Sequence, residues 1–246
     1  MKKYGTLLNS FGGGENRSLG FTLAEVLVTL GIIGVVSAMT LPTLVKNHQR
    51  TVYVTQLQKV VNELSQAVEK ATQENNAISL DETKYSPNAE NGARDFLNDN
   101  FKIANNCGTD LTPCFADSYK RLDGTAFTLQ NPSTVVSLAS GASVSSFNGW
   151  YDDAPICTDA NGHSYDCRLH GYYQLQVDIN GAQGPNIVGR DLFYMELYSD
   201  GKVAEQYTDK LDVNPGWHAD YCGESDATYG MGCLSKIMQD GWKMDY

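Results

Sequence analysis

The feature that most constrains this chain is a run of 20 residues, Val26 to Val45, that contains no Lys, Arg, Asp or Glu. A helix rises about 1.5 Å per residue, so the run would extend about 30 Å, which is the thickness of the hydrocarbon core of a bilayer. The run therefore predicts one membrane-spanning helix. An ordinary soluble protein is not expected to contain such a segment.

The length and charge of the whole chain limit what the part beyond this run can be. The 246 residues include 18 Lys and Arg against 29 Asp and Glu, a net charge of −11, and 41% of them are hydrophobic. This length and composition suit one sizeable domain, and the acidity argues against nucleic acid as a partner. Lys2, Lys3 and Arg17 outnumber Glu15 before the run. The positive-inside rule therefore predicts that the N-terminus stays in the cytoplasm and that the long C-terminal part is exported.

All of the cysteines lie after the apolar run, in three close pairs. They are Cys107 and Cys114, Cys157 and Cys167, and Cys222 and Cys233. An even number of cysteines beyond a membrane segment indicates disulfides in an oxidising compartment, and pairing in sequence order is the simplest connectivity. Zinc is the alternative, since His163, Cys167 and His170 lie close together, but no C-x2-C spacing is present.

The start of the run is Gly20-Phe21-Thr22-Leu23-Ala24-Glu25-Val26-Leu27, and its carboxylate needs an explanation. A secretory signal peptide has a shorter apolar stretch, and a plain signal anchor does not account for Glu25. The segment, continuing to Gly34 and Pro42, resembles the N-terminal signal of type IV pilins and type II secretion pseudopilins. That resemblance implies cleavage between Gly20 and Phe21 by a prepilin peptidase, followed by N-methylation of Phe21.

The resemblance also implies a single-pass protein of the bacterial inner membrane whose C-terminal domain lies in the periplasm, and it implies how such a chain assembles. Residues 1–20 would be a leader peptide and residues 21–45 the transmembrane and polymerisation helix. Glu25 would pair with the Phe21 amine of a neighbouring subunit, since a lone ammonium and a lone carboxylate are both costly in hydrocarbon. The implied partners are other pilin-like subunits, the prepilin peptidase and methylase, and an inner-membrane assembly platform with its ATPase.

Apolar periodicity continues beyond the membrane run. Helical spacing relates the positions Leu57, Val60, Val61, Leu64, Ala67, Val68 and Ala71. This pattern predicts one helix from about Phe21 to about Gln73, in which residues 46–75 form an amphipathic half packed on a globular domain. A coiled-coil stalk is the alternative for that half. Pro42 lacks an amide N–H, so a kink or local melting is expected there.

Residues 76–246 are expected to form a β-rich, disulfide-containing periplasmic domain. The patterns predict a helix over Gly92–Lys102, a hairpin that turns at Asp123-Gly124, strands over Tyr172–Ile179, Leu192–Tyr198 and Lys202–Tyr207, and one helical turn near Leu234. Pro132–Gly149 fits either strand or loop. Trp242 and Tyr246 are expected to pack on the core. Together with the long helix this predicts an α+β, pilin-like roll.

The loop from Asp178 to Asp191 is a candidate metal site. It resembles a loop of pseudopilin-like proteins, some of which bind calcium near this end of the sheet. Asp178, Asn180 and Asp191 offer the oxygen ligands that calcium prefers. The alternative is a turn held by Asp and Asn side chains. Apart from this possible structural calcium, no cofactor is expected.

No sequence motif of an enzyme is present. The chain has no H-E-x-x-H, no G-x-S-x-G and no P-loop. We therefore expect a structural subunit, most simply a type II secretion pseudopilin in a periplasmic filament that serves protein secretion. The alternatives are a type IV pilus subunit or a binding protein at a filament tip, and a membrane-anchored enzyme.

Overall fold

The computed structural model describes residues 21–147, 157–158, 164–165, 171–205, 222 and 232–246. It divides into two compact units, Met1–Lys46 and Asn47–Tyr246. Helix α1 (Leu23–Glu74) contributes its first part to one unit and its second part to the other. It starts and ends within two residues of the predicted bounds, and it runs without interruption through Pro42. Local melting at Pro42 is therefore wrong, and a kink there stays a prediction.

The remaining elements belong to the second unit. The helices are η1 (Leu80–Glu82), α2 (Gly92–Asn100) and α4 (Cys233–Gln239). The strands are β1 (Ile103–Gly108), β2 (Tyr119–Lys120), β3 (Ala126–Phe127), β4 (Thr134–Leu138), β5 (Ser143–Ser146), β6 (Cys157–Thr158), β7 (Ser164–Tyr165), β8 (Tyr172–Asp178), β9 (Leu192–Tyr198) and β10 (Val203–Ala204).

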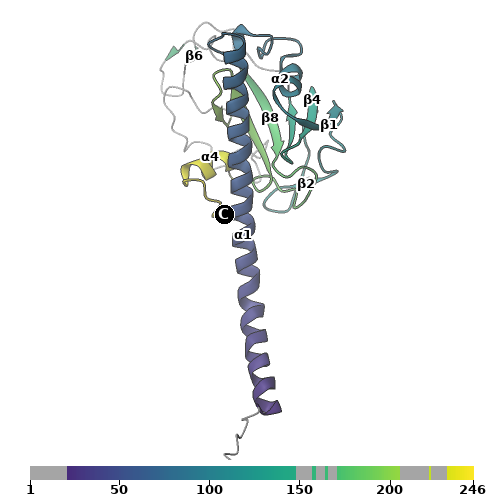
Figure 1. Ribbon diagram of the computed structural model, residues 1–246, viewed down its shortest axis with the longest axis vertical. Coiled ribbons are helices and arrows are strands. Elements are labelled where there is room, and N and C mark those ends of the chain that lie inside the picture. Colours follow the sequence, from purple (N-terminus) through teal and green to yellow (C-terminus); the bar gives the residue numbers. More distant parts are fainter. Residues whose placement is uncertain (1–20, 148–156, 159–163, 166–170, 206–221, 223–231) are drawn as a thin grey trace, which may run out of the picture. The chain divides into compact units, whose positions relative to one another are not determined.

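One six-stranded sheet with the order β1-β4-β5-β8-β9-β10 organises this unit, and every pairing in it is antiparallel. The α+β fold is therefore confirmed. The three predicted strands lie side by side as β8, β9 and β10, and the segment Pro132–Gly149 contains the strands β4 and β5. Figure 1 shows the second part of α1 lying across this sheet, with α2 at one end.

The core lies between the second half of α1 and one face of the sheet. The predicted stripe of α1 is buried, from Leu57 to Ala71, and it packs against Leu175, Val177 and Met195 of the sheet. A fully buried apolar side chain contributes about 1.5–3 kcal/mol. Packing therefore holds the second half of α1 as part of the domain, and a separate coiled-coil stalk is wrong.

Two local predictions need correction. In the hairpin, the Arg121 amide donates to the Thr125 carbonyl at 2.8 Å, and Gly124 has a φ of 88°. The turn therefore has three residues and ends in a left-handed glycine, and the predicted two-residue turn is wrong. The predicted helix over Gly92–Lys102 ends early, because Phe101 already has an extended backbone.

Candidate functional site

The beginning of α1 is closed by a reciprocal pair of side chains. The Thr22 amide and hydroxyl each donate to Glu25 Oε2 at 2.8 Å, and the Glu25 amide donates to Thr22 Oγ1 at 3.3 Å. This is the capping-box arrangement, in which the first and fourth residues satisfy each other's otherwise unpaired groups. It holds the Glu25 carboxylate at the first turn of the helix, directly before the apolar run.

The predicted cleavage site lies directly outside this cap. Phe21 precedes the first helical residue and is 87% exposed. Gly20 lies outside the described residues. The bond before Phe21 is thus next to non-helical backbone.

The first half of α1 is apolar and exposed. Residues 21–49 include no buried side chain, and large apolar residues such as Leu30, Ile33 and Met39 are at least 60% exposed. Within the described residues α1 is the one helix long and apolar enough to cross a membrane. A surface of this kind is unfavourable in water, so lipid or neighbouring helices must cover it.

The second candidate site is the loop between β8 and β9. The Asp178 and Asp191 side chains are both fully buried, and the Ile179 amide donates to the Asp191 carbonyl at 2.9 Å. The structure therefore brings the two predicted carboxylates to one place. Burial raises the pKa of Asp178 to about 7, although the hydrogen bond from the Tyr119 hydroxyl lowers it. Burial also raises the pKa of Asp191, against the hydrogen bonds from backbone amides.

Each oxygen of these carboxylates already accepts a hydrogen bond. Asp178 accepts from the Tyr119 hydroxyl at 2.6 Å and from the Asn180 amide at 3.1 Å. Asp191 accepts from the Asn186 and Ile187 amides, both at 2.6 Å. This geometry is that of a turn held by acidic side chains.

Asn180 is the third predicted ligand. Its side-chain Nδ2 donates to the Gly184 carbonyl at 3.2 Å, while its Oδ1 is buried without a hydrogen-bond partner. Among the described residues no three His, Cys, Asp or Glu side chains form a group that could hold a metal. Every oxygen of the two carboxylates already accepts a hydrogen bond, which favours the turn over a metal site, and calcium binding stays a prediction.

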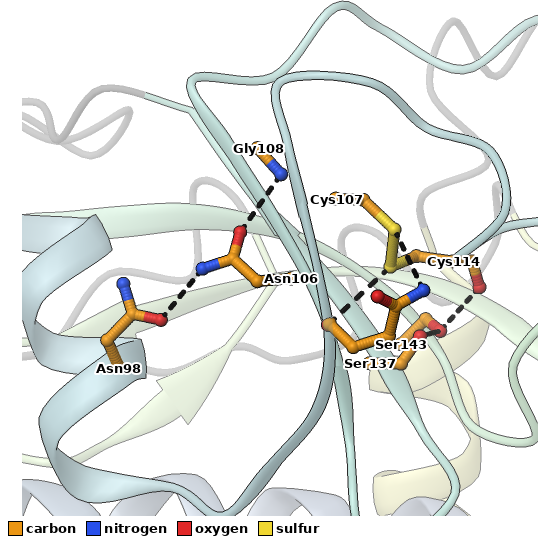
Figure 2. The surroundings of a disulfide bond; sticks show 8 residues. Asn98, Asn106, Cys107, Gly108, Cys114, Ser137 and Ser143 are labelled. Carbon is orange, nitrogen blue, oxygen red and sulfur yellow. Dashed lines mark hydrogen bonds between the residues drawn. A yellow bond between two sulfur atoms is a disulfide. The ribbon is translucent and has the colours of Figure 1, made fainter.

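Two of the three predicted disulfides are present in the described part of the chain. They join Cys107 to Cys114 and Cys222 to Cys233, as pairing in sequence order predicts. Figure 2 shows the first of them beside the strand pair β4–β5. The Ser143 hydroxyl donates to the Cys114 carbonyl at 2.6 Å, and its Oγ lies 2.9 Å from the Oγ of Ser137. The predicted pair Cys157–Cys167 and the alternative zinc ligands His163 and His170 lie outside the side chains that the structure describes.

Sequence reasoning missed three residues that organise these sites. Thr22 lies within the N-terminal motif, and its spacing of three residues to Glu25 is itself the signature of a capping box. Tyr119 donates to Asp178 from a distant strand, and no local pattern predicts that contact. Glu205 is buried and accepts hydrogen bonds from the Gly232, Leu234 and Ser235 amides at the start of α4.

Comparison with known families supports the first site. Residues 16–41 match the family model described as the prokaryotic N-terminal methylation motif. The match includes Gly20, Phe21, Thr22 and Glu25 and ends within the apolar run. Comparisons with curated proteins and with solved structures return no match.

Proposed function

We propose that this chain is a pilin-like structural subunit, of the type II secretion pseudopilin kind. A prepilin peptidase cuts it between Gly20 and Phe21, the new N-terminus at Phe21 is methylated, and the subunit joins a periplasmic filament through its apolar helix. An inner-membrane platform and its ATPase supply the force. The methylation motif at residues 16–41 and the α+β fold support this proposal.

The observation that carries the proposal is the position of Glu25. It is the one acidic or basic residue between Phe21 and Val45, and the capping box fixes it one helical turn from the predicted new N-terminus. A carboxylate in hydrocarbon is costly unless it has a partner. Cleavage creates an amine at Phe21, and a neighbouring subunit can present that amine to Glu25. The pair then sets the axial register between subunits.

This proposal is tested first at the N-terminus of the protein purified from its native membrane. Mass spectrometry should find a chain that begins with N-methyl-phenylalanine at Phe21. A chain that retains its first 20 residues would overturn the proposal.

Assembly itself is tested by two matched substitutions. Glu25→Gln removes the charge but keeps the shape, and it should abolish filaments while the subunit still accumulates in the membrane. Glu90→Gln is the control, because Glu90 is an exposed residue of the globular domain. Equal filament yields for both variants would contradict the role of Glu25.

The finer assignment to secretion rests on the loop between Asp178 and Asp191, which resembles a loop of pseudopilin-like proteins. Deletion of the gene should abolish secretion of folded proteins while leaving surface pili intact. Loss of surface pili with normal secretion would favour a type IV pilus subunit instead.

A further inference from the structure

The last residues of the chain are bound to α1 near the start of the second unit. Arg50 donates through Nη2 to the backbone oxygen of Tyr246 at 2.6 Å. The Tyr246 hydroxyl donates to the Gly189 carbonyl at 2.5 Å, and Met244 is buried in the core. Trp242 and Tyr246 are partly buried against the same core. The segment 241–246 therefore has a fixed position beside Arg50, and Figure 1 draws the C-terminal end beside α1.

The chain itself keeps this segment close to the membrane. Arg50 follows Val45, the last residue of the apolar run, by five positions. Five helical residues extend about 7.5 Å, and even a fully extended chain of five would reach only about 18 Å. The polar headgroup region begins where the hydrocarbon core ends. Arg50 and the residues bound to it thus lie within reach of the lipid headgroups.

Basic side chains gather at this place. Burial raises the pKa of the Tyr246 phenol and Glu205 raises it further, whereas Arg190 and Arg50 lower it, so both guanidinium groups are near the phenol. Lys243 is exposed and lies three residues before Tyr246. We call Arg50, Arg190 and Lys243 the basic foot.

Nearby acidic groups only partly offset the basic foot. Asp240 forms an ion pair with Lys236 at 3.3 Å, and Asp191 and Glu205 are buried and accept hydrogen bonds from amides. Asp245 is exposed and carries one opposing charge. Lys243 is exposed, whereas Arg50 and Arg190 are half-buried and Arg50 already binds the Tyr246 oxygen, so the basic foot keeps a small excess of positive charge. Elsewhere the unit is acidic, since residues 47–246 contain 14 Lys and Arg against 27 Asp and Glu, a net charge of 14 − 27 = −13.

We propose that the basic foot, together with Trp242 and Tyr246, docks the globular unit on the anionic phospholipid headgroups of the membrane that holds α1. Arginine and lysine bind lipid phosphates, and partly exposed Trp and Tyr are the aromatic residues favoured at membrane interfaces. The acidic remainder of the unit is repelled by the same surface, so docking also selects which side of the unit faces the bilayer. A subunit entering a filament has to release this contact.

The test uses the full chain in vesicles of phosphatidylcholine alone and of phosphatidylcholine with 30% phosphatidylglycerol. Lipids brominated near the headgroup quench tryptophan at the interface, and Trp150→Phe with Trp217→Phe leaves Trp242 as the reporter. We expect stronger quenching in the anionic vesicles, weakened by 0.5 M salt because exposed charges are screened.

Charge variants then isolate the foot. Lys243→Glu should lower the ratio of docked to undocked domain by about fivefold or more, since one basic residue near an anionic surface contributes about fivefold to that equilibrium. Lys102→Glu is the matched control, because Lys102 is an exposed lysine directly before the edge strand β1 and is not part of the basic foot. Hydrogen exchange of residues 241–246 in the otherwise unaltered chain gives a second measurement if the tryptophan variants fold poorly, and anionic lipid should slow it. Equal quenching and exchange in both vesicle types, or equal effects of Lys243→Glu and Lys102→Glu, would overturn the proposal.

Discussion

Replacing Glu205 tests how the C-terminal helix is held. Glu205 is only 1% exposed and follows β10. Its Oε1 accepts from the Gly232 and Leu234 amides at 2.9 and 3.2 Å, and its Oε2 accepts from the Ser235 amide at 2.9 Å. These are amides of the first turn of α4, which have no partner within the helix.

The cost of truncation follows from these three contacts. Glu205→Ala leaves three buried amide groups without an acceptor, and each unsatisfied group costs about 1–3 kcal/mol. Partial access of water lowers the sum, so we expect a loss of about 3 kcal/mol in the free energy of unfolding. For a domain of this size that corresponds to a melting temperature lower by about 6–12 °C. Glu205→Gln keeps one acceptor oxygen and should lose about 1 kcal/mol, since its new amide group faces a donor.

Thermal unfolding of the full chain in detergent micelles, followed by near-ultraviolet circular dichroism, measures both variants. Glu90→Ala is the control, because it removes a glutamate from an exposed position. The expected order of melting temperatures is wild type with Glu90→Ala, then Glu205→Gln, then Glu205→Ala. If Glu205→Ala melted together with Glu90→Ala, the amide contacts of Glu205 would contribute nothing to stability, and the reasoning would be refuted.

Three further outcomes are expected. Burial raises the pKa of Asp178, Glu196 and Glu205 to about 7, above the ordinary values of 3.8 to 4.5, so protonation of these groups stabilises the folded state at low pH and this stability is lost as the pH rises through 7. The melting temperature should therefore be higher at pH 5 than at pH 8. The reverse order would be inconsistent with buried acids. Leu64→Ala, in the core, should lower the free energy of unfolding by about 2–5 kcal/mol in the same assay. Leu30→Ala, at a position 60% exposed, should leave the melting temperature unchanged. Similar losses of stability for both variants would show that the first half of α1 packs on the domain. Calcium titration by calorimetry should give no saturable heat at millimolar metal, because amide and hydroxyl groups already donate to the carboxylates of the 178–191 loop. Saturable heat would show that the loop is a metal site rather than only a hydrogen-bonded turn.

The sequence predicts the long helix well because its two ends have local causes. Thr22 and Glu25 cap the start, and Asn76, with a φ of 50°, adopts the left-handed conformation common just after helix ends. The amphipathic stripe between Leu57 and Ala71 has the helical period over several turns. Such long periodic patterns depend little on the rest of the fold.

The sheet is predicted less completely because its second face has no simple pattern. Tyr173, Leu175 and Val177 alternate along β8 and face the core, as predicted. On the opposite face, Gln176 and its cross-strand partner Tyr194 are also buried, together with Glu196. Polar residues at alternate positions normally indicate a solvent-exposed face. Burial of this face depends on tertiary packing, which the period of a single strand does not report.

The two candidate sites also differ in how far the sequence predicts them. Gly20, Phe21 and Glu25 are predicted from sequence because they lie in one short motif, and residues 16–41 match the methylation-motif family model. Asp178 and Asp191 were correctly placed together, yet their hydrogen-bond donors came from Tyr119 and from the backbone. Residue types show which side chains could bind a metal through oxygen, but they do not show whether those oxygens already accept hydrogen bonds. The hydrogen bonds distinguish a turn from an open metal site.

The two halves of α1 show why the average composition of this chain is a poor guide to its behaviour. The half before Lys46 is apolar on all sides and buries nothing within its own chain, whereas the half after it buries one stripe and exposes charged residues such as Glu69 and Lys70. A soluble domain needs only the second kind of surface. The first requires lipid before assembly and neighbouring helices after it, and a segment that is stable in either environment can move from one to the other at modest cost. An apolar helix with one carboxylate at its start therefore agrees with the proposed function, in which the subunit is held in a membrane before it joins a filament.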